Sequence, residues 1–195
     1  GPADHEVRRQ IIAAALQHFG LHGYEKTTVS ELAKAIGFSK AYVYKFFESK
    51  QAIGASICAT CLGEIETEVN AALAEVDTPP EKLRRLFAVC LDATLTFFAQ
   101  HPRLYEIATS AAAEEWPEVL AFEAHMLSSV EDIVRQGRAS GDFESVTPID
   151  EATRGIYLVM RPYLNPLFLQ YEVETVRESS VILTDLMLRS LTLKQ

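Results

Sequence analysis

Apolar residues recur along most of the chain at the three- and four-residue spacing of amphipathic helices, and no run alternates as a strand would. The first helix is expected to begin near Asp4 and to end where Gly20 and Gly23 interrupt the pattern. After two short helices, a long helix is expected from its cap, Ser49, towards Glu75. The pattern predicts an all-α protein.

Prolines and turn formers divide the remaining chain into further helices. Pro79 and Pro80 are tolerated at a helix start but not inside a helix, so they mark a boundary. The further helices are expected over about 81–100, from Pro102, from Trp116-Pro117 to Arg138, over 149–171, and from Thr175 to Leu193. The chain is therefore expected to hold about nine helices.

The two short helices carry strong local signals. Thr28 is followed three residues later by Glu31, which is the capping-box spacing, and Gly37 ends that helix because glycine readily adopts a left-handed backbone. Ser39 is expected to cap the next helix, which should extend to about Phe46. Two short helices joined by a glycine turn and packed on a preceding helix form a helix-turn-helix. We therefore expect a three-helix DNA-binding domain over residues 4–48 and a larger helical domain over 49–195.

Charge is distributed unevenly between these regions. The net charge of −9 argues against nucleic acid at first sight. Residues 1–54, however, carry seven Lys/Arg and five Asp/Glu, whereas the remaining residues carry 11 and 22. Only the N-terminal part is therefore expected to approach a polyanion.

The stretch GFSKAYVYKFFESK, residues 37–50, is both aromatic and basic, with five aromatic rings and three lysines. In a helix-turn-helix the second helix lies in the major groove of DNA. Val43 and Phe47 are four residues apart and are expected to face inward. The residues expected to face DNA are Ser39, Lys40, Tyr42 and Lys45 as donors, Ala41 where the backbones approach closely, and Tyr44 on a phosphate.

Two helix starts are expected to add phosphate contacts. Thr27 and Thr28 lie where free N–H groups attract phosphate oxygens. Lys50 lies in the first turn of a helix, where a cation opposes the helix dipole unless a phosphate is bound there. The alternative for Lys50 is an ordinary solvated lysine.

The segment TTVSELAKAIGFSKAYVYKFFESK resembles the helix-turn-helix of the TetR family of bacterial transcriptional regulators, and the resemblance covers about residues 7–54. The matching positions are Thr27, Thr28, Gly37, Tyr44, Phe47 and Lys50. Tyr42 replaces a small or polar residue and Phe46 replaces a common histidine, so the bases that are read are expected to differ. The resemblance implies a repressor that binds a palindromic double-stranded DNA operator and is released by a small-molecule inducer.

The resemblance also implies a homodimer formed through the last two helices. The final helix has one apolar line through Leu183, Met187 and Leu191 and another through Ile182 and Leu186. Such a wide apolar face exceeds the stripe of a lone surface helix. Completion of the monomer core is the alternative explanation for part of this face.

A largely apolar ligand pocket is the third implication, because aromatic walls with a few polar groups are typical of small-molecule sites. The candidate lining residues are Phe87, Phe97, Phe98, Tyr105, Trp116, Phe122, His125, Met126, Tyr157, Met160 and Arg161. For any individual ring, plain core packing is the more common explanation. Pro162 and Pro166 are expected to kink their helix next to Arg161, either to shape an interface or to line a polar corner of the cavity.

Other chemistry receives little support. No nucleophile–base pair indicates an enzyme, and no histidine pair is expected at metal-ligand spacing on one helix, so neither a metal nor a cofactor is expected. Cys58, Cys61 and Cys90 form no disulfide framework, and a role in redox sensing stays open. The polar N-terminus predicts no secretion signal, and no apolar run is long enough to span a membrane, so a reducing cytoplasm is expected. A helix-turn-helix that binds protein rather than DNA is the remaining alternative.

Overall fold

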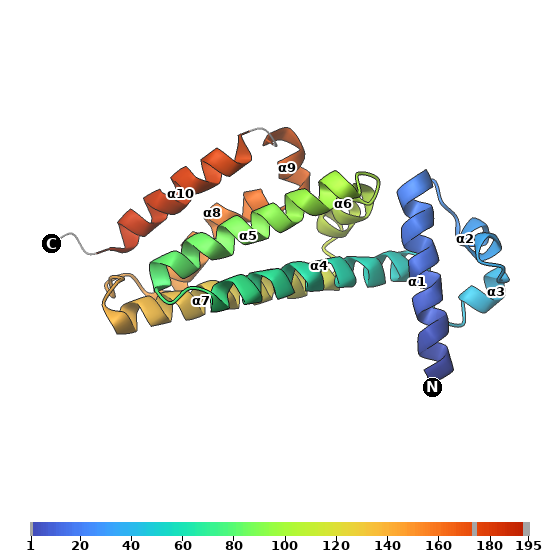
Figure 1. Cartoon of the computed structure of the whole chain (residues 1–195), viewed down its shortest axis with the longest axis horizontal. Coiled ribbons are helices and arrows are strands. Elements are labelled where there is room, and N and C mark those ends of the chain that lie inside the picture. The colour runs from blue at the N-terminus through green and yellow to red at the C-terminus, as the bar shows by residue number, and fades with distance from the viewer. Residues whose placement is uncertain (1, 173–174, 193–195) are drawn as a thin grey trace. The chain divides into compact units, whose positions relative to one another are not determined.

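The computed structural model describes residues 2–172 and 175–192, and this part of the chain contains ten α-helices and no β-strand (Figure 1). The helices are α1 (Pro2–His22), α2 (Val29–Ala35), α3 (Lys40–Val43), α4 (Lys50–Ala74), α5 (Pro79–Gln100), α6 (Tyr105–Ala113), α7 (Pro117–Ser140), α8 (Ile149–Leu164), α9 (Pro166–Glu172) and α10 (Val176–Leu191). The predicted all-α class is confirmed. The expected end of the last helix at Leu193 lies outside the described residues.

Contacts within the chain divide it into two compact units. The N-terminal unit comprises residues 1–62 and 97–119, and the C-terminal unit comprises residues 63–96 and 120–195. Helix α6 thus belongs to the same unit as the helix-turn-helix. The sequence was expected to divide by function into a DNA-binding domain over residues 4–48 and a ligand-binding and dimerisation domain over residues 49–195. This functional division stays a prediction.

One hydrophobic core positions the short helices of the N-terminal unit. Its largest contributions come from Ile11, Phe19, Tyr24, Leu32, Val43, Phe47, Ile53, Ile57, Ile107 and Trp116. Helices as short as α2, with seven residues, and α3, with four, are not stable alone in water. Burial of each large apolar side chain contributes about 1.5–3 kcal/mol, so this packing holds α2 and α3 in place.

Helix α1 ends within the predicted stretch FGLHGY, but Gly20 does not interrupt it. It continues through Gly20 to His22, and Gly23, with a φ of +86°, ends it. A glycine inside a helix costs about 1 kcal/mol relative to alanine. The complete burial of the adjacent Phe19 outweighs that cost.

The single helix expected over residues 149–171 is instead two helices, which accounts for the tenth helix. Asn165 has an extended backbone, with φ −92° and ψ 120°, because the ring of a following proline disfavours the helical region. Its side-chain Oδ1 accepts a hydrogen bond of 2.9 Å from the backbone N–H of Leu167. Pro166 therefore begins α9, whereas Pro162 remains inside α8.

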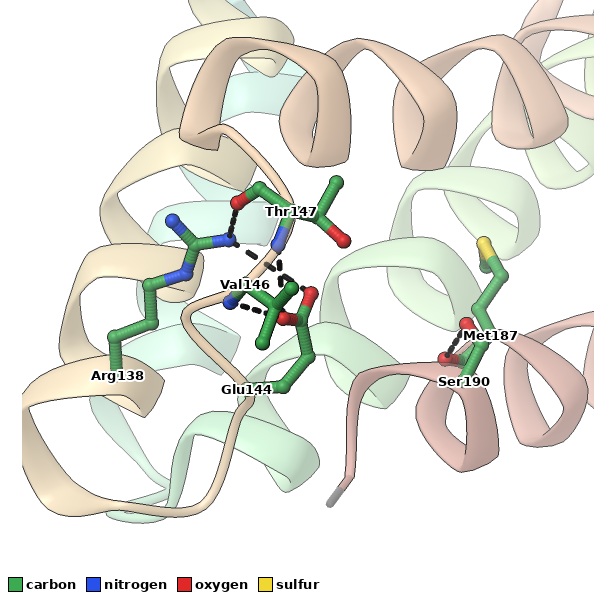
Figure 2. Close-up of polar contacts among 6 residues, drawn as sticks. All are labelled: Arg138, Glu144, Val146, Thr147, Met187 and Ser190. Atoms are coloured by element: carbon green, nitrogen blue, oxygen red, sulfur yellow. Dashed lines mark hydrogen bonds and ion pairs between the residues drawn. The ribbon is translucent and has the colours of Figure 1, made fainter. Parts of the chain in front are cut away.

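Hydrogen bonds of Glu144 and Arg138 hold together the loop between α7 and α8 (Figure 2). The buried carboxylate of Glu144 accepts hydrogen bonds from the backbone N–H groups of Val146 and Thr147 and lies 4.0 Å from Arg138. Arg138 also donates to the carbonyl of Thr147 at 2.6 Å. The backbone N–H of Glu144 donates to the carbonyl of Leu191 at 2.7 Å, which joins the loop to the end of α10.

Candidate nucleic-acid interface

The local signals of the helix-turn-helix are confirmed. Thr28 and Glu31 form the complete capping box at the start of α2. Gly37 has a φ of +73°, which reverses the chain between α2 and α3. The hydroxyl of Ser39 then accepts a hydrogen bond of 3.1 Å from the N–H of Tyr42 and caps α3. Helix α3 ends at Val43, short of the expected Phe46, and continues as hydrogen-bonded turns.

The second helix has an inner and an outer side, as predicted. Val43 and Phe47 are buried in the core. The exposed residues are Ser39, Lys40, Ala41, Tyr44 and Lys45. Tyr44 is 42% exposed. The outer side thus presents two ammonium groups and a phenol.

Three partly buried aromatic rings of this segment form a row. Phe38 and Tyr42 meet edge to face with their centroids 5.0 Å apart, and Tyr42 meets Phe46 in the same way at 5.3 Å. The ammonium of Lys45 lies 5.6 Å from the ring of Tyr42, and that of Lys40 lies 5.7 Å from the ring of Tyr44. The two positions that depart from the family pattern, Tyr42 and Phe46, are therefore in contact with each other.

The structure changes the interpretation of the two threonines. The side chain of Thr27 is 2% exposed and its hydroxyl donates to the carbonyl of Gly23 at 2.7 Å, so it points into the protein rather than towards a phosphate. The N–H of Thr28, expected to be free for a phosphate, donates to Glu31 at 2.8 Å. These hydrogen bonds from Thr28 lower the pKa of Glu31 and keep it ionised.

Lys50 is turned towards the protein. Its ammonium donates to the carbonyls of Tyr24 at 3.0 Å and Glu25 at 3.4 Å, and it lies 4.4 Å from the centroid of the Tyr24 ring. It is therefore not the solvated lysine of the alternative interpretation. A phosphate contact by Lys50 stays a prediction, and the structure adds a role in holding the turn between α1 and α2.

Sequence reasoning missed Arg8. Its guanidinium lies 4.3 Å from the centroid of the Phe47 ring and donates to the carbonyl of Phe46. It thus places another cation beside the end of the second helix. The local spacing of residues around Arg8 gave no signal, because the contact joins residues 38 positions apart.

The candidate ligand residues fall into both units. Phe97, Phe98, Tyr105 and Trp116 belong to the N-terminal unit. Trp116 is buried in the core beneath the helix-turn-helix, and its indole N–H donates to Glu114 at 2.8 Å. Its need for a polar partner is thus met within the protein. Phe98 packs edge to face on Tyr105 with the centroids 4.6 Å apart.

The other candidates belong to the C-terminal unit. Phe87, Phe122, Met126 and Met160 are buried. His125 Nε2 and Thr153 Oγ1 are buried with no hydrogen-bond partner among the described residues. Burial and then the charge of Glu123 raise the pKa of Tyr157 well above its usual value, against the opposing charge of Arg161, so the phenol stays protonated. Arg161, which precedes Pro162 inside α8, is exposed and pairs with Glu123 at 3.3 Å.

Two of the three cysteines, Cys58 and Cys90, are buried. Burial raises the pKa of Cys58 to about 11 and that of Cys90 to about 12, so both are protonated thiols near neutral pH and poor nucleophiles.

The histidine expectation was wrong in one respect. Because α1 reaches His22, the rings of His18 and His22 lie on one helix face with centroids 4.5 Å apart and planes tilted by 49°. No group of three or more potential metal ligands occurs among the described residues. None of the described helices is long and apolar enough to cross a membrane.

Comparison with known proteins adds independent findings. A family described as "Bacterial regulatory proteins, tetR family" matches residues 11–57, and "Tetracyclin repressor-like, C-terminal domain" matches residues 79–180. The chain is 31% identical over 87 residues to the HTH-type transcriptional regulator BetI of Brucella melitensis. That match covers 45% of this chain and 44% of BetI, so it spans less than half the length of this curated relative.

Two solved structures share the fold along most of the chain. The regulator PfmR of Thermus thermophilus has a TM-score of 0.62 and 26% identity, with 94% of this chain and 96% of that chain covered. FadR of Bacillus subtilis, solved in complex with stearoyl-CoA, has a TM-score of 0.68 and 19% identity, with 94% and 98% covered.

The helix-turn-helix, the helical C-terminal part and these matches define a class of protein, the helix-turn-helix transcriptional regulators. The chain belongs to the TetR family of bacterial regulatory proteins, and the resemblance seen in residues 7–54 is confirmed.

Proposed function

We propose that this protein is a homodimeric repressor that binds a palindromic DNA operator and leaves it when a small, largely apolar ligand binds. The observation that carries the proposal is the outer side of the second helix, where Lys40, Tyr44 and Lys45 are exposed while Val43 and Phe47 anchor the helix in the core. A buried inner side fixes the helix, and the outer side can then enter a major groove.

Each DNA-binding residue has a proposed task. Lys40, Tyr42 and Lys45 reach base edges or phosphates, Ser39 and Ala41 allow close approach at the start of α3, and Tyr44 donates its hydroxyl to a phosphate. Thr28 and Lys50 flank the same face at the starts of α2 and α4. The side chain of Thr27 is left out because it is buried.

The proposed ligand site lies within the C-terminal unit. Phe87, Phe122, Met126 and Met160 supply apolar walls, and His125 and Thr153 supply buried polar atoms that lack a partner in the described part of the protein. Buried polar atoms are nearly always hydrogen-bonded, so a polar group of a ligand is a suitable partner for them. The stearoyl-CoA in the FadR structure belongs to that protein, and at 19% identity it does not define the ligand here.

The proposed dimer interface uses the exposed apolar side of α8 to α10. The last helix has two apolar lines. Met187 and Leu191, on the first line, are buried in the monomer core, whereas Ile182 and Leu186, on the second, are 59% and 60% exposed. Leu158 of α8 and Phe168 of α9 are exposed as well. A second copy of the chain would cover this surface, and a dimer presents two recognition helices to two half-sites.

The deciding experiment is selection of duplexes from a random-sequence pool by the wild-type chain, followed by affinity measurement on the selected duplex. The proposal expects a palindromic consensus and steep salt dependence, about tenfold or more between roughly 50 and 200 mM salt. Failure to enrich any duplex would contradict it. Tyr44→Ala should weaken DNA binding at unchanged dimerisation, whereas retained DNA affinity would favour a protein-binding module.

The inducer step is tested by screening small apolar acids, alcohols and acyl compounds for binding to the wild-type chain. A bound compound should lower operator affinity, and the duplex should weaken binding of that compound by the same factor, because coupling is reciprocal. Unchanged DNA affinity with every bound compound would refute inducer release.

Membership in a family of regulators supports the absence of catalytic activity.

A further inference from the structure

We propose that Glu106 of α6 is a positioning residue of the DNA interface, which acts by holding the turn that leads into α2. This inference rests on the proposed DNA-binding function. Glu106 lies 81 residues from the turn in the sequence, and no DNA-binding role was expected for it.

The carboxylate of Glu106 is seated directly on the turn. Its Oε2 accepts a hydrogen bond of 3.2 Å from the backbone N–H of Glu25. A Cβ atom at Gly23 would stand only 3.0 Å from the same oxygen, closer than almost all real contacts. Gly23 also has a φ of +86°, which favours glycine, and a Cβ atom there would force the carboxylate of Glu106 to shift.

Two side chains of opposite charge hydrogen-bond to the backbone of the turn. The carboxylate of Glu106 accepts from the N–H of Glu25, and the ammonium of Lys50 donates to the carbonyls of Tyr24 and Glu25. Hydrogen bonds to charged groups are stronger than those between neutral groups. Ser110, one helical turn after Glu106, approaches the side chain of Glu25 at 3.5 Å and adds a second point of attachment from α6.

The turn leads directly into the proposed DNA contacts. Thr28 follows it and caps α2, and Thr27 is bonded back to Gly23 and Tyr24. A shift of the turn therefore displaces the start of α2, and α3 with it, because α2 and α3 pack on each other. Glu106 needs no contact with DNA to influence binding.

The sign of the expected effect separates positioning from simple electrostatics. Removal of a negative charge should by itself strengthen binding to a polyanion. Loss of a positioning hydrogen bond should weaken it, by about two- to fivefold for one partly exposed bond. Glu106→Gln removes the charge but keeps an oxygen that can accept from Glu25, so it should retain wild-type affinity or exceed it.

The experiment uses the full chain and a duplex selected from a random pool by the wild-type protein. Operator affinity is measured for wild type, Glu106→Ala, Glu106→Gln and the exposed control Glu48→Ala, and exchange of the Glu25 amide proton is followed by NMR. We expect weaker binding and faster exchange at Glu25 for Glu106→Ala alone, with an unchanged salt slope and a native fold by circular dichroism.

Two outcomes overturn the inference. The first is a Glu106→Ala variant that binds as tightly as wild type or more tightly. The second is a Glu106→Gln variant as weak as Glu106→Ala, because the retained acceptor would then have no effect. If the wild-type protein selects no duplex, the proposed function is refuted instead. In that case, protection of the Glu25 amide proton from exchange still tests its hydrogen bond to Glu106.

Discussion

The ammonium of Lys50 lies 4.4 Å from the centroid of the Tyr24 ring and donates to the Tyr24 carbonyl at 3.0 Å. The two residues come from the first turn of α4 and from the turn before α2, so this contact links the end of the helix-turn-helix to its beginning. An ammonium has three N–H donors, and the carbonyls of Tyr24 and Glu25 use two of them. The third can serve a phosphate.

Lys50→Met tests both roles, because methionine keeps the apolar stem and removes the ammonium. We expect operator affinity to fall about tenfold and the slope of log affinity against log salt to become shallower by about 0.9, the value of one phosphate contact. The measurement is a salt titration of DNA binding by fluorescence anisotropy. A fall in affinity at an unchanged slope would show that Lys50 acts only through the turn.

Lys45→Ala tests the outer side of the second helix directly. Lys45 is exposed and its ammonium lies near the ring of Tyr42, so its removal disturbs no core packing. We expect a several-fold loss of affinity and a salt slope shallower by about 0.9, at unchanged thermal stability. Arg135→Ala is the matched control, since Arg135 is an exposed cation of the C-terminal unit. Equal effects of both substitutions would mean that only net charge matters.

Local features of this fold were predictable from the sequence, and long-range ones were not. The caps at Thr28 and Ser39 and the glycine turn involve residues within four positions of one another, so their spacing reveals them. The position of Trp116 depends on packing against Tyr24 and Gly54, far away in the sequence, and no periodicity encodes it.

The break at Asn165 is an intermediate case. The sequence shows two prolines four residues apart, and a kink was expected at each. Only the second ends its helix, because Asn165 before it adopts an extended backbone and its side chain accepts from the N–H of Leu167. The orientation of the Lys50 side chain is likewise set by the carbonyls of Glu25 and Tyr24, which lie 25 and 26 residues away in the sequence.

The proposed dimer interface is tested by charge on α10. The double variant Ile182→Glu, Leu186→Glu places carboxylates on its most exposed apolar side chains. Burial of each such side chain contributes about 1.5–3 kcal/mol, and two-fold symmetry doubles the number lost. We expect the molar mass from light scattering to fall from dimer to monomer. Val146→Glu, at a loop residue that is 86% exposed, should leave the mass unchanged. A double variant that stays dimeric would place the interface elsewhere.

Gly137 and Gly155 offer a matched pair of helical glycines. A Cβ atom at Gly137 would lie 2.0 Å from the ring of Phe143, whereas nothing lies within 4 Å of one at Gly155. Gly137→Ala should therefore destabilise the protein by about 1–3 kcal/mol through overpacking. Gly155→Ala should stabilise it by about 0.5–1 kcal/mol through helix propensity. Chemical denaturation measures both, and a stable Gly137→Ala variant would contradict the packing of Phe143.

Glu144 should make stability depend on pH. Hydrogen bonds from Thr147, then the N–H of Val146 and the charge of Arg138, hold the pKa of its carboxyl below the usual 4.5, against the opposing effect of burial. A lowered folded-state pKa means that the stabilisation is fully present above about pH 4.5 and is lost as the pH falls through the folded-state value.

Glu144→Gln should accordingly unfold at a lower temperature than wild type near neutral pH, because glutamine accepts hydrogen bonds less strongly than a carboxylate and forms no ion pair. The difference in Tm between the two proteins should shrink as the pH is lowered below about 4.5, since protonation removes the same charge from wild type. Glu151→Gln, at an exposed position of α8, is the control and should show no such dependence. A pH-independent difference in Tm would mean that Glu144 stabilises the loop through its shape rather than through its charge.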